Sequence, residues 1–226
     1  MKKTIKALLI LLLIASMLFV LTGCGDKETA EKEDKEEAVE QKQETNVEQE
    51  EKAPEFSMGE WNNKVYTNDF LGLKYNLPEG WTYSSEAEIA QMMSVGAELL
   101  NDDQKAAAEI AKLTSVYYMV AQDSNTGNNV NIFSEKQLAD ITIEEYINAL
   151  ETQLLAVQSM NYKVEGTSKE KIGNIEADTL TLSVTASGIE IMQKYYIYKI
   201  DKYMIGIIAT SLNGETGINE IAKCFE

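Results

Sequence analysis

The most restrictive feature of the sequence is a run of four segments near the C-terminus that are rich in Thr, Val, Ile and Tyr. Pairs of residues that favour tight turns separate these segments, and such pairs join neighbouring antiparallel strands. The pattern predicts a four-stranded meander made of Tyr162 to Lys171, Ile175 to Ala186, Ile189 to Ile200 and Tyr203 to Thr210.

The last hairpin of the meander also predicts its own register. If Asp201 and Lys202 form the loop, one face carries three facing pairs, Ile200 with Tyr203, Tyr198 with Ile205 and Tyr196 with Ile207. The other face carries a second apolar set, made of Tyr195, Ile197, Met204 and Ile208. Because both faces are apolar, other elements are expected to cover both of them.

Further strands and the covering helices come from the rest of the chain. Capping boxes, Ser85 with Glu88 and Thr142 with Glu145, precede apolar residues at helical spacing. Helices are expected over residues 86–113, as a helical pair or one kinked helix, over 143–157, and over Thr216 to Phe225. Strands are expected at Val65 to Asn68, Leu71 to Leu77, Val116 to Gln122 and Asn129 to Ser134. We predict an α+β fold in which helices cover both faces of an antiparallel sheet of about six to seven strands.

The N-terminus has the pattern of an export signal. Three lysines precede the apolar run Ala7 to Leu21, which is shorter than the roughly 20 residues of a membrane-spanning helix. The run ends in Leu21-Thr22-Gly23-Cys24, which resembles the lipobox of bacterial lipoproteins. The alternative interpretation of this segment is a buried or uncleaved helix.

The lipobox resemblance implies cleavage between Gly23 and Cys24 and attachment of diacylglycerol, with acyl chains such as palmitate, to the Cys24 thiol. Two or more acyl chains hold a protein firmly, so Cys24 is expected to anchor it on the extracytoplasmic face of the bacterial cell membrane. Residues 1–23 are then a signal peptide, and Cys224 is the free thiol that remains in the mature chain.

Residues 24–57 are expected to form a lipidated N-terminus and a disordered acidic tether. From Gly25 to Ser57 the sequence has 13 acidic residues and 5 lysines, with no aromatic residue before Phe56. Such a segment buries too little apolar surface to fold by itself, and the alternative is a binding tail. Residues 58–226 are long enough for one domain with a core of its own.

Charge and composition exclude several functions. Residues 58–226 carry 24 acidic residues and 12 lysines, and the whole chain has a net charge of −17, so it would repel nucleic acid and anionic lipid headgroups. The chain contains no histidine and no arginine. Catalytic triads and metal sites that need histidine are therefore excluded. We expect no enzyme, no cofactor, and no catalytic or metal-binding residue.

Three local features are candidates for chemistry. Asp123, Asn125 and Asn129 alternate around Gly127, but the loop lacks the glycine and glutamate positions of an EF-hand, so a hairpin turn is expected instead of a calcium site. Cys224 has no histidine to activate it and is expected to pack as a small hydrophobe. The meander tyrosines are expected in the core, the alternative being a ligand groove lined by Tyr195, Tyr196, Tyr198 and Tyr203.

A second resemblance lies in the segment Tyr66 to Trp81, which ends in Pro78-Glu79-Gly80-Trp81, and in the closing helix Ile218 to Phe225. Both segments are similar to PsbP-like and DcrB-like domains. The resemblance implies an α/β/α sandwich that acts as a non-catalytic binding or accessory module for a membrane or envelope protein. The metal-linked histidines of the photosynthetic members have no equivalent here. The alternative function is a small-ligand receptor that serves a membrane transporter.

Overall fold

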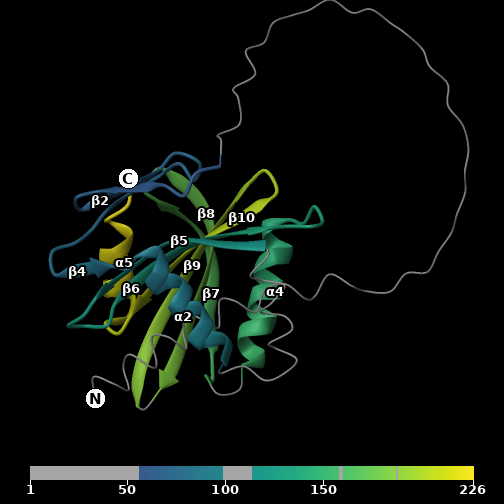
Figure 1. The fold of residues 1–226 in the computed structure, drawn as a ribbon. Coiled ribbons are helices and arrows are strands. Elements are labelled where there is room, and N and C mark those ends of the chain that lie inside the picture. Colours follow the sequence, from purple (N-terminus) through teal and green to yellow (C-terminus); the bar gives the residue numbers. More distant parts are fainter. Residues whose placement is uncertain (1–55, 99–113, 158–159, 187) are drawn as a thin grey trace, which may run out of the picture.

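The computed structural model describes residues 56–98, 114–157, 160–186 and 188–226, which form two antiparallel sheets and three helices (Figure 1). The helices are α2 (Glu86–Glu98), α4 (Ile143–Ala156) and α5 (Gly214–Ala222). The strands are β1 (Glu60–Asn62), β2 (Val65–Asn68), β3 (Leu73–Asn76), β4 (Trp81–Tyr83), β5 (Ser115–Asp123), β6 (Asn129–Lys136), β7 (Lys163–Ile172), β8 (Ile175–Ala186), β9 (Ile189–Ile200) and β10 (Tyr203–Ser211).

The larger sheet has seven strands in the order β4-β5-β6-β10-β9-β8-β7, and it contains the predicted meander. The bounds of β8 and β9 are those predicted, and β7 and β10 differ by one residue. The predicted register is confirmed, because Ile200 pairs with Tyr203, Tyr198 with Ile205 and Tyr196 with Ile207. Asp201 adopts a φ of 50°, the left-handed conformation that a two-residue hairpin loop requires.

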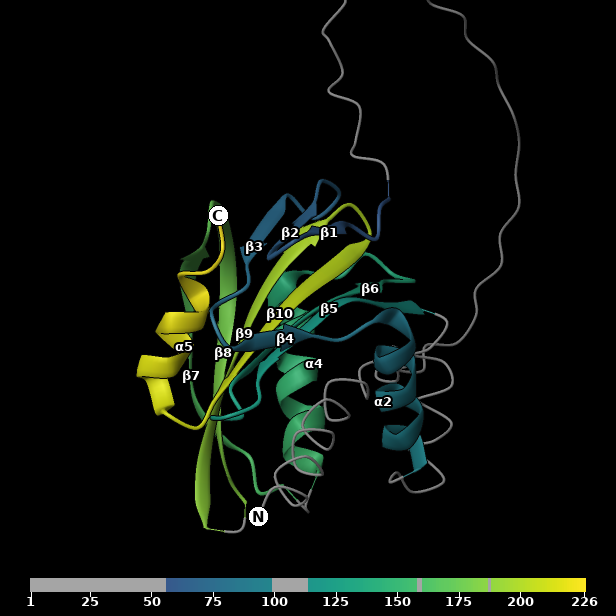
Figure 2. The ribbon, with the colours of Figure 1, turned by 60° about the vertical axis from the view of Figure 1, so that its left-hand side comes forward.

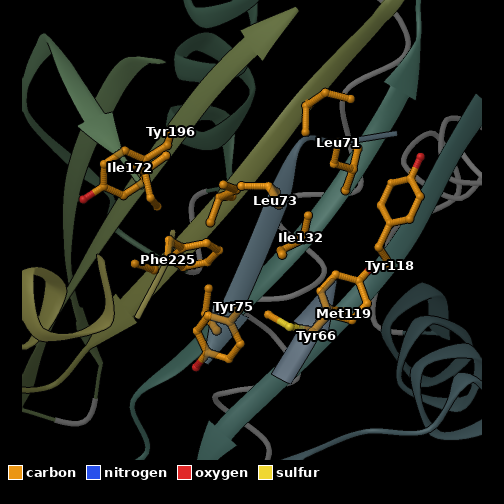
Figure 3. Packing of buried hydrophobic residues seen from close by; sticks show 14 of the residues in the cluster. Tyr66, Leu71, Leu73, Tyr75, Tyr118, Met119, Ile132, Ile172, Tyr196 and Phe225 are labelled. Atoms are coloured by element: carbon orange, nitrogen blue, oxygen red, sulfur yellow. The ribbon is translucent and has the colours of Figure 1, made fainter. Parts of the chain in front are cut away.

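One face of the larger sheet is covered by α5 together with the smaller sheet, whose order is β1-β2-β3 (Figure 2). Tyr66, Leu73 and Tyr75 from the smaller sheet pack with Ile132 and Tyr196 from the larger one (Figure 3). The sequence predicted β2 and β3 as strands. It did not predict β1 or β4, and it did not predict that a separate small sheet would cover the larger one.

The opposite face is covered by α4 and α2. Leu150 and Leu154 of α4 pack on Tyr195 and Ile197, and Ile89 of α2 packs on Val120. Helices therefore cover both faces, and the predicted α+β fold class is confirmed. The capping box of α4 is present as predicted, with the Glu145 amide donating to Thr142 Oγ1 at 3.1 Å and the Thr142 amide donating to Glu145 Oε2 at 2.8 Å.

The C-terminus is tied to distant parts of the chain. Phe225 forms an antiparallel bridge with Tyr75 of β3, and their ring centroids are 4.9 Å apart. The Glu226 amide donates to the Lys74 carbonyl at 2.9 Å, and the Glu226 carboxylate pairs with the Lys74 ammonium. The last residues therefore hold α5 against the smaller sheet.

Several predicted features lie outside the described residues. They are the second helical run, Gln104 to Leu113, the signal peptide and lipobox with Gly23 and Cys24, and the tether up to residue 55. Among the helices that the structure describes, none is both long enough and apolar enough to cross a membrane.

Candidate functional site

A polar groove of about 400 Å³ lies along the end of the larger sheet formed by β7, β8 and β9, next to the first turn of α5. It opens on the sheet face that α5 and the smaller sheet cover. Charged and hydroxyl side chains dominate its lining, which includes Glu165, Ser168, Glu170, Thr181, Lys194 and Glu215.

Lys194 is the buried charge of this groove, with only 6% of its side chain exposed. Its ammonium donates to both carboxylate oxygens of Glu170, at 2.8 and 3.1 Å. Burial acts to raise the pKa of Glu170, but the hydrogen bonds from Lys194 and Ser168 outweigh it and lower the pKa. Glu170 is therefore ionised at neutral pH and neutralises the charge of Lys194.

Hydroxyl groups extend this ion pair across β7 and β8. The Ser168 hydroxyl donates to Glu170 Oε1 at 2.8 Å, and its oxygen lies 2.7 Å from that of Thr179 on the neighbouring strand. The Ser183 hydroxyl donates to Glu165 Oε1 at 2.6 Å. Because these bonds join paired strands, they hold the carboxylates of the groove in place.

The groove carries an excess of negative charge. Glu165 pairs with the Lys163 ammonium at 2.9 Å, but the Lys163 side chain is 73% exposed, so solvent screens this pair strongly. Glu215 is exposed in the first turn of α5 and adds another carboxylate. With Lys194 neutralised by Glu170, the groove is complementary to a basic group.

The polar groups of the groove are paired with one another. The amine of Lys194 is held by a bidentate ion pair, and the Ser168 and Ser183 hydroxyls donate to ion-paired carboxylates. A nucleophile beside an available base is absent from the groove residues that the structure describes. Within the described parts of the chain there is also no group of three or more Cys, Asp or Glu side chains that could hold a metal ion.

Asp123 forms the hairpin turn that the sequence predicted. Its carboxylate accepts from the Asn125 amide and from the Thr126 hydroxyl, both at 2.8 Å. Burial acts to raise the pKa of Asp123, but these hydrogen bonds outweigh it and lower the pKa. Both carboxylate oxygens of Asp123 therefore accept hydrogen bonds from within the turn.

The other predicted site residues are also located by the structure, apart from Cys24, which lies outside the described residues. Cys224 is half-buried against the core, its thiol donates to the Glu220 carbonyl at 3.4 Å, and burial raises the pKa of the thiol. Tyr195, Tyr196 and Tyr198 are buried in the core, as expected. Tyr203 is half-buried beside that core.

Sequence reasoning did not identify the groove. Its one local signal is Lys194, a lysine on the same strand face of β9 as Tyr196 and Tyr198, which are buried in the core. Its partner Glu170 is 24 residues away along the chain, and only the pairing of β7, β8 and β9 brings the two together.

No protein-family model matches the sequence, and no curated protein matches it. Among solved structures, the chain is similar to cyanobacterial PsbP (CyanoP) from Synechocystis sp. PCC 6803, with 11% identity and a TM-score of 0.44, over 72% of this chain and 90% of that one. It is also similar to LpqN, involved in cell envelope biogenesis of Mycobacterium tuberculosis, with 13% identity and a TM-score of 0.39, over 68% and 81% of the two chains. A protein from Bacteroides thetaiotaomicron VPI-5482 shows 13% identity and a TM-score of 0.36, over 68% of this chain and 44% of that one.

Proposed function

We propose that this chain is a non-catalytic binding module, anchored by a lipid on Cys24 to the extracytoplasmic face of the bacterial cell membrane, that recognises a protein of the cell envelope. The observation that carries the proposal is the groove beside α5. Its buried charge, Lys194, is already neutralised, whereas Glu165 and Glu215 remain exposed to a partner. A basic side chain of the partner would complement these two carboxylates.

The charge of the domain favours a protein as the binding partner rather than the lipid surface of the membrane. A domain with 24 acidic residues and 12 lysines is repelled by anionic headgroups, so it would not lie flat on such a membrane. The acidic segment between Cys24 and Phe56 would hold the domain away from the bilayer, where another envelope protein is accessible.

The anchor is tested by lipid labelling of two cysteine variants in a bacterial host. Cys24→Ala should yield an unlipidated and uncleaved precursor, because the lipid is attached to that thiol. The matched control is Cys224→Ala, which removes the other cysteine and should leave labelling unchanged. Normal labelling of the Cys24→Ala variant would disprove the proposed anchor.

The groove is tested by photo-crosslinking of the full chain in cells. A benzophenone amino acid at Thr181 should yield a discrete adduct with one envelope protein. The same group at Thr152, an exposed position on α4, should not. Adducts of equal yield from both positions would show that the groove is not the binding surface.

Charge complementarity is tested with two double variants of equal net charge, both carrying the crosslinker at Thr181. Glu165→Gln with Glu215→Gln should lower the adduct yield by about threefold to tenfold, because exposed ion pairs each contribute little. Glu79→Gln with Glu144→Gln changes exposed residues away from the groove and should leave the yield unchanged. If both double variants lower the adduct yield equally, only the overall charge matters, and the proposed role of the groove carboxylates is wrong.

A further inference from the structure

β7 forms a long free edge of the larger sheet. It is the last strand in the order of that sheet and has 10 residues, whereas β4 at the other end has 3. Outside its ladder with β8, no backbone hydrogen bond joins β7 to another residue that the structure describes. An edge of this length offers a row of N–H and C=O groups to which a segment of another protein can add as a further strand.

The register of β7 and β8 fixes which backbone groups face outward. Ile172 and Ile175 close a two-residue loop, and the closing pair of such a hairpin exchanges both of its backbone hydrogen bonds. Hydrogen-bonded and non-hydrogen-bonded pairs alternate along an antiparallel ladder, so Thr167 and Lys169 point their N–H and C=O groups away from β8. Their side chains lie on the face that α4 covers, because Thr167 is opposite Leu180.

A bulge in β7 gathers acidic side chains on the other face, beside α5. The register shifts between Val164 and Gly166. Strict alternation would put Glu165 and Glu170 on opposite faces, but the shift brings both into the groove. Gly166 has a φ of 149°, which favours glycine, and a Cβ atom there would meet no atom beyond its chain neighbours within 4 Å. The bulge therefore leaves open space at the edge of the groove.

The charge of the groove indicates which side chains an added strand would carry. Glu170 is paired with the buried Lys194, whereas the partner of Glu165 is the exposed Lys163. Glu215 adds a further carboxylate from the first turn of α5. We propose that β7 accepts an antiparallel strand of the partner protein, with basic side chains at alternate positions over the groove. This strand is the form in which the partner of the proposed function would be bound, so the inference rests on that function.

An antiparallel strand would satisfy the free backbone groups and the carboxylates at the same time. Residues directly opposite Thr167 and Lys169 would exchange hydrogen bonds with them, and their side chains would lie on the face that α4 covers. The intervening residues would turn their N–H groups away from β7 and their side chains toward the groove. All pairs in the larger sheet are antiparallel, and this is the more stable type of pairing. A segment that alternates neutral and basic residues meets both requirements.

Other occupants of the edge are disfavoured by charge. A second copy of the chain would place its own Glu165 and Glu170 against the same acidic groove, and like charges on neighbouring strands destabilise their pairing. The segment Gly25 to Ser57, with 13 acidic residues and 5 lysines, also has the wrong charge. Lysines and a bulge on an edge hinder pairing with apolar strands, and β7 has both. These features select a strand of complementary charge.

The pairing is tested with three peptides of equal charge. The probe is the acetylated and amidated heptapeptide Thr-Lys-Thr-Lys-Thr-Lys-Thr, and its two variants carry methyl groups on the backbone nitrogens of two threonines or of two lysines. In the antiparallel arrangement the threonine N–H groups point toward β7 and the lysine N–H groups point away from it. The unmethylated peptide should bind the purified full chain with a dissociation constant below about 1 mM in an NMR titration. Threonine methylation should weaken binding at least about tenfold, and lysine methylation less than about threefold.

The comparison separates strand pairing from general attraction between a basic peptide and an acidic protein. Absence of binding by the unmethylated peptide, equal affinities of the two methylated peptides, or a greater loss from lysine methylation would overturn the pairing. Glu165→Gln with Glu215→Gln should weaken the unmethylated peptide more than Glu79→Gln with Glu144→Gln does. Binding that needs the groove glutamates but ignores methylation would disprove the added strand alone and leave the proposed function intact. Sensitivity to methylation without sensitivity to the groove glutamates would count against the groove.

Hydrogen exchange of the full chain, followed by NMR, tests where the strand is added. The amides of Thr167 and Lys169 should exchange quickly in the free chain and at least about tenfold more slowly with saturating unmethylated peptide. The amide of Ser168 points toward β8 and should be protected in both states. Protection of Thr167 and Lys169 in the free chain, together with a dimer in sedimentation, would show that a second copy occupies the edge and would overturn the proposal.

Discussion

Ending the chain at Asn213 is expected to unfold the domain or to leave it barely stable. The deletion removes Ile218, Ile221 and Phe225, which are 0%, 2% and 5% exposed. Burial of three large side chains contributes about 5 to 9 kcal/mol, because each contributes about 1.5 to 3 kcal/mol. This is comparable with the whole stability of a typical domain, about 5 to 15 kcal/mol. The deletion also removes the bridge between Phe225 and Tyr75.

The measurement is urea denaturation followed by circular dichroism, with two controls. Removal of residues 1–53 should leave the midpoint unchanged, since the acidic segment carries no apolar cluster that could join the core. This control keeps Phe56, whose ring centroid is 5.4 Å from that of Phe70. Glu226→Gln should change the midpoint only slightly, because it weakens an exposed ion pair with Lys74 and an exposed hydrogen bond from Asn76. An unchanged midpoint after truncation at Asn213 would show that α5 does not hold the fold together.

The second large effect is a loss of stability of about 3 kcal/mol as the pH rises from about 5 to 8, caused by one carboxyl group. Glu135 is 3% exposed and lies on β6, where it is hydrogen-bonded to the Tyr146 hydroxyl at 2.9 Å. Burial raises the pKa of Glu135 to about 7, although the hydrogen bond from Tyr146 acts to lower it. The folded protein therefore holds a proton that the unfolded chain, with an ordinary glutamate pKa of 4.5, has already released.

The direction of the pH dependence follows from this difference. A raised pKa in the folded state stabilises the fold fully below about pH 4.5, and this stabilisation is lost as the pH rises through about 7. A change in pKa from 4.5 to about 7 corresponds to about 3 kcal/mol. Because the chain has no histidine, few other groups titrate in this window.

Glu135→Gln should therefore make the free energy of unfolding nearly constant between pH 5 and 8. The measurement is a series of urea titrations across this pH range. Glu144→Gln is the control, because Glu144 is exposed on α4 and its replacement should keep the slope of the wild-type protein. A wild-type protein whose stability is constant over this range would show that Glu135 is ionised or solvated in the folded state.

Some of the structure follows from the sequence because it depends on residues close together in the chain. The register of β9 and β10 is set by the loop at Asp201 and Lys202 and by strict alternation along each strand. The capping box of Thr142 and Glu145 is likewise complete within four residues. Alternation also predicted that both faces of the meander would be covered, since apolar residues fill both.

The candidate sites depend on contacts between residues far apart in the chain. Lys194 meets Glu170 across β8, and the buried Glu135 of β6 is hydrogen-bonded to Tyr146 of α4. Tyr195 was correctly assigned to the core, but its unpaired hydroxyl depends on which polar groups the other strands bring near it.

The sequence by itself determined the meander, its register, the capped helices and the acidic character of the domain, because turn chemistry, alternation and charge act over a few residues. Only the tertiary structure decided that β1, β2 and β3 form a separate sheet beside α5 and that Phe225 pairs with Tyr75, 150 residues earlier. The physical reason is that an apolar face requires burial but does not specify which element buries it. Which of several apolar elements buries it is decided by the shapes and lengths of all of them together.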